Sequence, residues 1–258
     1  MTPRSALLVR LAGRAAGIVL AAVFQLTLAA SGQSKVAAPM PGCGLADHEP
    51  SSPLLSQNIV AASKVASQDT GVAATGDLLQ SLRSASFPEL SHIDLRTRTF
   101  HSQSDYLRTR FSIPRFFLPV RMRYYIDLNP ALFAQQQAPP DGLCGIVAHE
   151  LAHVVVLSRG NRIRRLGLIR LLSRRQTVSF ERGADLDAIH RGYGDGLKSY
   201  RSWVYSHIPS RKLEEKLRNY FSPEEIATIQ KRLQEEPDLF VYWRRHVPTN
   251  LEEIQRTR

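Results

Sequence analysis

The chain has 258 residues with a formal net charge of +11, and 43% of the residues are hydrophobic. Outside residues 15–30 no stretch is apolar enough to span a bilayer, which excludes a membrane protein with several spans. Two cysteines are too few for a small fold held together by disulfide bonds. The composition is that of a basic protein with its own hydrophobic core.

Residues 1–30 have the pattern of an export signal. Arg4, Arg10 and Arg14 form a basic start, and Ala15–Ala30 is almost entirely apolar with small residues at its end. We expect a cleaved signal peptide; the alternative is an uncleaved N-terminal anchor. Both predict an exported protein that is periplasmic or anchored to the membrane facing the periplasm. No nucleic-acid partner is expected, because an exported chain does not normally meet one.

The remaining chain divides into two parts by composition. Residues 31–92 are rich in Ala, Ser and Pro with weak periodicity, which predicts a low-complexity linker or pro-segment. From Ile93 to Arg258 the pattern tightens, and these roughly 160 residues suffice for one domain with a sizeable core. Within them, Arg121–Leu128 is typical of a strand that ends at Asn129-Pro130.

The segment H-E-L-A-H at residues 149–153 is the most informative part of this domain. On a helix His149 and His153 project from one face, so each can present a ring nitrogen to one metal ion. Glu150 would lie beside the metal, where it can accept a proton from a bound water. An apolar stripe and a preceding Pro-Pro-Asp predict a helix at about Asp141–Ser158. The alternative is a buried helix whose two histidines only form hydrogen bonds.

The next segment, Arg162–Arg175, contains six arginines and no acidic residue. Its apolar residues repeat every third position, which predicts an amphipathic helix. Such a helix can lie on an anionic membrane surface or bind an acidic partner. The alternative is a helix packed on the core with an arginine-rich face toward solvent.

A catalytic zinc site needs a third protein ligand and an open position for water. Val156 and Arg159 stand where the extended metzincin pattern requires Gly and His, so that arrangement is excluded. Glu181 and Asp185 are four residues apart and share a face if this segment is helical. Glu181 can then be the carboxylate ligand, while Asp185 accepts the other ring N–H of a ligating histidine. The alternative is a solvated helix face.

These paired motifs resemble those of the gluzincin zinc metallopeptidases, in the branch of the CAAX-processing and heat-shock peptidases. The chain also resembles a set of uncharacterised bacterial predicted metallopeptidases, with which it shares short runs in residues 104–106, 125–130 and 191–194. The resemblance implies that His149, His153 and Glu181 bind one zinc ion per chain, that Glu150 is the catalytic base, and that Asp185 orients His149. It also implies that the strand Arg121–Leu128 borders the cleft and pairs with an extended substrate. The membrane-embedded relatives have several transmembrane helices, whereas this chain has at most one.

The C-terminal part is expected to be helical. Leu197–Ile208 forms one helix, and Ser222-Pro223 begins another that continues to about Glu235, since Ser, Pro and two acids are typical of a helix start. The large aromatic residues of this part are expected to pack it against the metal-binding helix. Cys144 is expected to be a small buried hydrophobic residue. The predicted fold is α+β: a mostly helical, zincin-like domain with a small sheet bordering the active-site helix.

The sequence thus predicts a zinc-dependent endopeptidase acting on a protein or peptide. Many gluzincins add a His or Tyr donor for the developing oxyanion; Tyr193 and His190 are the first candidates here, with Tyr200 and His207. Two other functions stay open. One is a zinc-containing, catalytically weak module that binds a membrane surface, against which the presence of Glu150 argues. The other is a metal-dependent hydrolase of a non-protein amide, which a closed small pocket would favour over a long groove.

Overall fold

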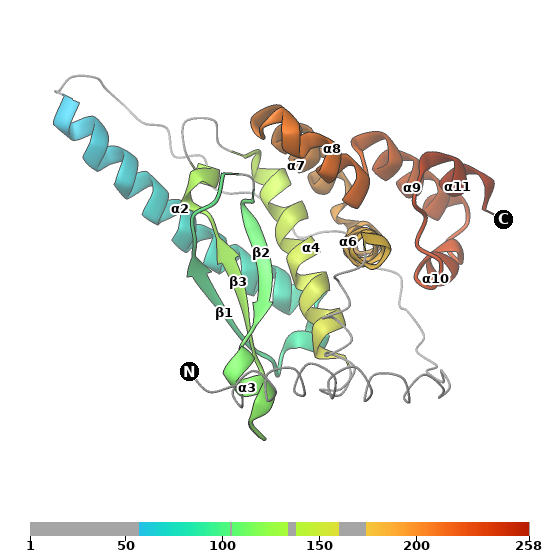
Figure 1. The fold of residues 1–258 in the computed structure, drawn as a ribbon, viewed down its shortest axis with the longest axis horizontal. Coiled ribbons are helices and arrows are strands. Elements are labelled where there is room, and N and C mark those ends of the chain that lie inside the picture. Colours follow the sequence, from blue (N-terminus) through green and yellow to red (C-terminus); the bar gives the residue numbers. More distant parts are fainter. Residues whose placement is uncertain (1–56, 104, 134–137, 160–173, 258) are drawn as a thin grey trace, which may run out of the picture. The chain divides into compact units, whose positions relative to one another are not determined.

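The structure is a computed structural model that describes residues 57–103, 105–133, 138–159 and 174–257 (Figure 1). All of these belong to one compact unit, Pro39–Arg258. The predicted export signal, Cys43 and residues 162–173 of the arginine-rich segment lie outside the described residues.

The sheet has three strands, β1 (Asp94–Thr99), β2 (Leu107–Phe111) and β3 (Arg123–Leu128). Their order is β1-β3-β2, with β3 parallel to β1 and antiparallel to β2. The strand predicted at Arg121–Leu128 is therefore the central one, and both of its edges are already paired. It cannot take up a substrate backbone, so the role implied for it is wrong. Among the described residues β2 is the edge strand that contacts the helix of the H-E-L-A-H segment.

The two faces of the sheet differ, as strand alternation requires. One face is apolar and packs on helix α4 (Pro140–Ser158), and the hydroxyl of Tyr124 donates to the carbonyl of Leu157 at 3.1 Å. The opposite face carries arginines from all three strands. Asp127 in its centre is buried, and its carboxylate oxygens lie 2.9 Å from the guanidinium of Arg98 and 3.1 Å from that of Arg108. The buried hydrophobic residues of the face toward α4 are Leu95, Leu107, Tyr124, Ile126 and Leu128.

Helix α4 confirms the helix predicted at Asp141–Ser158 and is buried along nearly its whole length. Pro140 occupies its first turn, where a missing N–H costs nothing, and Asp141 complements the helix dipole there. By length and apolar composition α4 is the one helix among the described residues that could cross a membrane. A buried core helix meets the same criterion, so the finding assigns no membrane span. Cys144 is buried in α4 as expected, and it is disulfide-bonded.

Helix α7 (Gly194–His207) packs closely along α4 and corresponds to the helix expected at Leu197–Ile208. Two glycines permit this approach: a Cβ on Gly145 would collide with the backbone of Leu197, and one on Gly196 with the carbonyl of Asp141. A methyl group at either position would push the two helices apart. This close packing brings the side chains of α7 beside the face of α4 that carries His149.

Helix α6 (Arg174–Ala188) carries the second motif and continues through a π-helical turn (Ile189–Tyr193) into α7. Gly192 in this turn has φ = 92°, which favours glycine. Helix α8 (Ser210–Asn219) precedes α9 (Pro223–Glu235), whose predicted capping residue Ser222 accepts from Glu225 in a complete capping box. Two short helices, α10 (Leu239–Trp243) and α11 (Leu251–Arg256), complete the chain.

The boundary drawn at residue 93 differs from the structure. Helix α2 (Gln57–Ser86) and a short turn, η1 (Pro88–Leu90), lie within the stretch expected to be a linker or pro-segment. Leu79, Leu82 and Phe87 of this stretch are buried in the core. The sequence does not reveal this packing, because only a few large apolar residues are spaced among Ala, Ser and Thr. Helix α2 therefore contributes only a narrow apolar stripe to the core.

The remaining elements are α3 (Ile113–Phe117) and η2 (Pro130–Phe133). The described chain is thus α+β and mostly helical, with a small mixed sheet against α4.

Candidate metal centre

His149 and His153 lie one turn apart on α4 and are both buried. Their ring centroids are 4.5 Å apart and the rings are nearly perpendicular, at 84°. The i, i+4 spacing therefore places both imidazoles on the same face, as the sequence predicts.

Glu181 reaches both histidines from α6. Its Oε2 atom lies 3.4 Å from Nε2 of His149 and 3.0 Å from Nε2 of His153. Ligand atoms at about 2.1 Å from a tetrahedral metal ion are about 3.4 Å from one another, so these separations match a shared ion. The ligating atoms of all three residues lie within 4.8 Å of one another. The His149–His153–Glu181 cluster can therefore hold a metal ion.

Asp185 lies behind the first histidine and is completely buried. Its Oδ1 atom is 2.7 Å from Nδ1 of His149 and 2.7 Å from the guanidinium of Arg201, and its Oδ2 accepts from the backbone N–H of Phe221 at 3.0 Å. With Nδ1 turned to Asp185, the Nε2 atom of His149 is the one that faces Glu181. Arg201 was not found from the sequence, since no fixed spacing relates an arginine on α7 to the motif.

The charges of the cluster shift the pKa values of its members. Burial alone would lower the pKa of His149, but the carboxylates of Asp185, Glu181 and Glu150 outweigh it and raise the pKa to about 9. Burial would raise the pKa of Glu181, yet the two histidines hold it well below its usual range. Asp185 likewise has a lowered pKa, because Arg201 and His149 outweigh its burial. Without a metal, the two carboxylates are ionised and His149 carries a proton at neutral pH.

The second histidine is held differently. The ring of His153 stacks on Phe180, with centroids 4.3 Å apart and an angle of 19° between the planes. Its Nδ1 atom is buried and has no hydrogen-bond partner among the described residues. Stacking, in place of a carboxylate, therefore orients the second imidazole.

Glu150 is buried next to the first histidine, and β2 fixes its side chain. The hydroxyl of Thr109 lies 2.7 Å from Oε2 of Glu150 and 3.0 Å from its backbone carbonyl oxygen. Glu150 is not one of the three ligands that converge. The edge strand thus holds the Glu150 carboxylate beside the cluster. Among the described residues no ion pair joins an arginine to Glu150, and Arg201, which lines the same cavity, pairs with Asp185.

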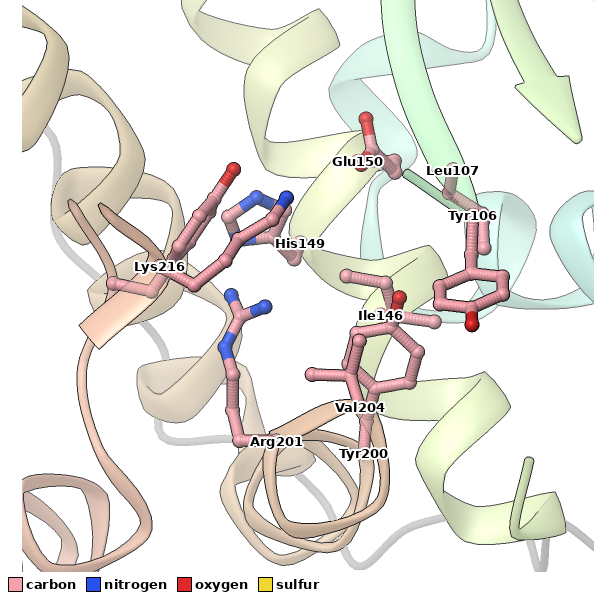
Figure 2. Close-up of a pocket in the computed structure, with 10 residues that line it drawn as sticks. Tyr106, Leu107, Ile146, His149, Glu150, Tyr200, Arg201, Val204 and Lys216 are labelled. Carbon is pink, nitrogen blue, oxygen red and sulfur yellow. The ribbon is translucent and has the colours of Figure 1, made fainter. Parts of the chain in front are cut away.

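A small cavity of about 30 Å³ adjoins His149 and Glu150. In Figure 2 Tyr106 and Leu107 lie on one side of it, and Arg201 and Lys216 on the other. Its volume suits a water molecule or a small group. The complete lining comprises Tyr106, Leu107, Ile146, His149, Glu150, Tyr200, Arg201, Val204, Lys216 and Tyr220.

Tyr220 is a residue of this cavity that the sequence did not point to. Its ring centroid is 5.9 Å from that of His149, and the guanidinium of Arg201 lies over the ring at 4.2 Å. Burial raises the pKa of the Tyr220 hydroxyl well above its usual value, and the charges of Glu181 and Glu150 raise it further. The phenol therefore keeps its proton and can act as a hydrogen-bond donor.

The first two oxyanion candidates lie elsewhere. The hydroxyl of Tyr193 is 2.5 Å from that of Ser86, at the end of α2, and His190 stacks on Phe240 at 3.5 Å. Neither lines the cavity, so the structure does not bring them to the candidate site. Of the other two, Tyr200 lines the cavity, whereas His207 stacks on Trp203.

Comparison with protein-family models, with curated proteins and with solved structures gives no match to this chain. A functional interpretation therefore rests on the chemistry of the cluster.

Proposed function

We propose that this protein is a zinc-dependent endopeptidase with a zincin-like fold, of the gluzincin type. The observation that carries the proposal is the position of Glu150. A cluster that only stabilises the fold has no use for a buried carboxylate beside its ligands, whereas hydrolysis needs a base there. Two imidazoles and one carboxylate form a set that suits zinc and leaves a fourth position for water.

Zinc held by His149, His153 and Glu181 would lower the pKa of a bound water and polarise the scissile carbonyl group. Glu150 accepts the proton of the attacking water and then delivers it to the departing amine. Asp185 and Arg201 keep His149 in the orientation in which Nε2 faces the metal.

Two further groups near the cavity suit the binding of a peptide substrate and of the oxyanion that forms from it. The edge of β2 that pairs with no other described strand offers backbone N–H and C=O groups to an extended peptide, next to the Thr109–Glu150 contact. Tyr220 is the residue we assign as hydrogen-bond donor to the developing oxyanion, in place of Tyr193 and His190.

The small cavity supports a second candidate, hydrolysis of a small non-protein amide. A volume of about 30 Å³ beside Glu150 is far below that of a site enclosing a long side chain. An endopeptidase needs the substrate to lie along β2 and outside this cavity.

The first prediction concerns metal dependence. Chelation of the purified full chain is expected to abolish hydrolysis of unfolded casein, and about one equivalent of zinc per chain should restore it. Mass spectrometry measures the zinc content, and gel electrophoresis measures the cleavage of casein. Hydrolysis of small acyl amides without casein cleavage would favour the second candidate. Bound zinc with neither activity would favour a binding module, and failure to bind zinc would refute the metal site.

A second prediction concerns Thr109 as a positioning residue. Thr109→Val is expected to lower kcat about tenfold, because the hydrogen bond that positions the Glu150 carboxylate is lost. KM should change much less than kcat, since Thr109 acts on the position of the base. Thr97→Val is the matched control, because Thr97 and Thr109 pair with the same residue, Ile126, from opposite sides. A rise in KM with kcat unchanged in Thr109→Val would contradict this role.

A further inference from the structure

An exposed apolar cluster lies at the connection between β2 and β3. Ile113 and Phe117 of α3 are 58% and 74% exposed, and Leu118 and Val120 after it are 52% and 43% exposed. These four are half of the eight large hydrophobic residues that are exposed among the described residues. Such clustering marks an interaction surface, whereas singly scattered apolar residues do not.

The connection between β2 and β3 is anchored to the rest of the fold by side-chain contacts. Phe116 is buried beneath it, with its ring 5.8 Å from that of Phe111 and 5.2 Å from that of Phe117. The guanidinium of Arg115 donates to the carbonyl of Arg121 at 3.1 Å and so closes the base of the loop. With Phe116 anchored inward, Phe117 is presented outward; Figure 1 shows α3 at one end of the sheet.

The sheet face that continues from this loop is strongly basic. Between Asp94 and Leu128 the chain has more arginines than aspartates. Four of these arginines, on β1 and β2, have side chains that are 44–60% exposed although they pair with Asp94 or Asp127. An apolar tip is thus bordered by a surface with excess positive charge. The four arginines are Arg96, Arg98, Arg108 and Arg110.

We propose that residues 112–121 insert into the interface of an anionic lipid bilayer, with the basic sheet face lying on its headgroups. Aromatic and aliphatic side chains enter the boundary of headgroups and acyl chains, while arginines beside them bind anionic lipid. The proposal does not depend on the peptidase activity.

Two other partners fit the surface less well. On the basic sheet face, two rings that could stack with nucleic-acid bases are covered by this protein's own guanidinium groups, Arg98 over Tyr125 at 3.7 Å and Arg108 over Phe100 at 4.0 Å. A stable protein interface buries about 800 Å² per partner around an apolar centre, whereas here a small apolar tip adjoins a wide charged face.

The test places a fluorescent reporter at the tip of the loop. In the full-length Phe117→Trp variant, the added emission is expected to shift to shorter wavelength with phosphatidylglycerol-containing vesicles and to be quenched by brominated lipid. Tyr242→Trp is the matched control, because Tyr242 is also exposed but lies on α10. Both variants retain residues 1–30, so attachment through that segment affects both equally. Subtracting the wild-type signal removes Trp203 and Trp243.

The charge requirement is tested with Arg110→Gln/Arg121→Gln in the Phe117→Trp background. Loss of two arginines near the surface should raise the vesicle concentration for half-maximal shift about 30-fold. Arg245→Gln/Arg256→Gln removes the same charge elsewhere and should have little effect. The proposal is overturned if the emission added by Phe117→Trp stays unchanged while the protein binds vesicles, or if neutral vesicles act equally well. A shift that follows protein concentration without vesicles would indicate a second copy of the chain instead, and would also overturn it.

Discussion

Glu150→Gln is expected to lower kcat for casein hydrolysis by about 10³-fold while about one zinc ion per chain stays bound. Glutamine has nearly the shape of glutamate and can still accept the Thr109 hydroxyl, so α4 and the ligands should keep their positions. It cannot take a proton from water, and loss of a general base costs about 10²- to 10⁴-fold. Steady-state kinetics and metal analysis on the same preparation measure both quantities.

The control for this variant is Glu235→Gln, at an exposed glutamate of α9. It should leave both kcat and metal content unchanged. If Glu150→Gln retained full activity, the proton would have to be taken by another group. If it lost zinc, Glu150 would belong to the metal-binding groups, and the assignment of three ligands would need revision.

The parts of the site that are local in sequence could be predicted. His149 and His153 are on one face because a helix repeats every 3.6 residues, and Glu181 and Asp185 share a face of α6 for the same reason. The helix at Pro223–Glu235 followed from its capping residues. In each case the information lies within a few consecutive residues, so it does not depend on how the chain folds back.

The parts contributed by tertiary packing could not be predicted. Thr109, Arg201 and Tyr220 reach the site from β2, α7 and the residue after α8, and each is a single side chain without a repeating pattern. Strand β2 itself was missed because its sequence, Leu-Arg-Thr-Arg-Phe, has charged residues on the solvent face and is short, as edge strands often are. Tyr193 is a candidate oxyanion donor from the sequence, yet the structure directs its hydroxyl from the π-helical turn to Ser86 of α2.

Arg201 and His149 are coupled to each other through the buried carboxylate of Asp185. Both cations lie against one carboxylate that is fully buried, and the peptide N–H of Phe221 occupies its other oxygen. Removal of one partner of a buried ion pair leaves the other charged and desolvated, which costs more than the pair itself contributes.

Asp185→Ala is therefore expected to lower the free energy of unfolding of the metal-free protein by about 3–5 kcal/mol. It should also weaken zinc binding about 10- to 100-fold, because His149 loses the group that orients it. Urea denaturation and zinc titration measure the two effects. Asp195→Ala, at an exposed aspartate paired with Lys198, should change the unfolding free energy by less than about 1 kcal/mol.

A double variant separates the two roles of Asp185. In Asp185→Ala/Arg201→Met the buried unpaired cation is gone, so much of the lost stability should return. Zinc affinity should remain as low as in Asp185→Ala, since no carboxylate faces Nδ1 of His149. Recovery of both quantities would mean that Asp185 serves only to neutralise Arg201. Recovery of stability alone would establish that the same carboxylate both stabilises the core and orients the metal-binding histidine.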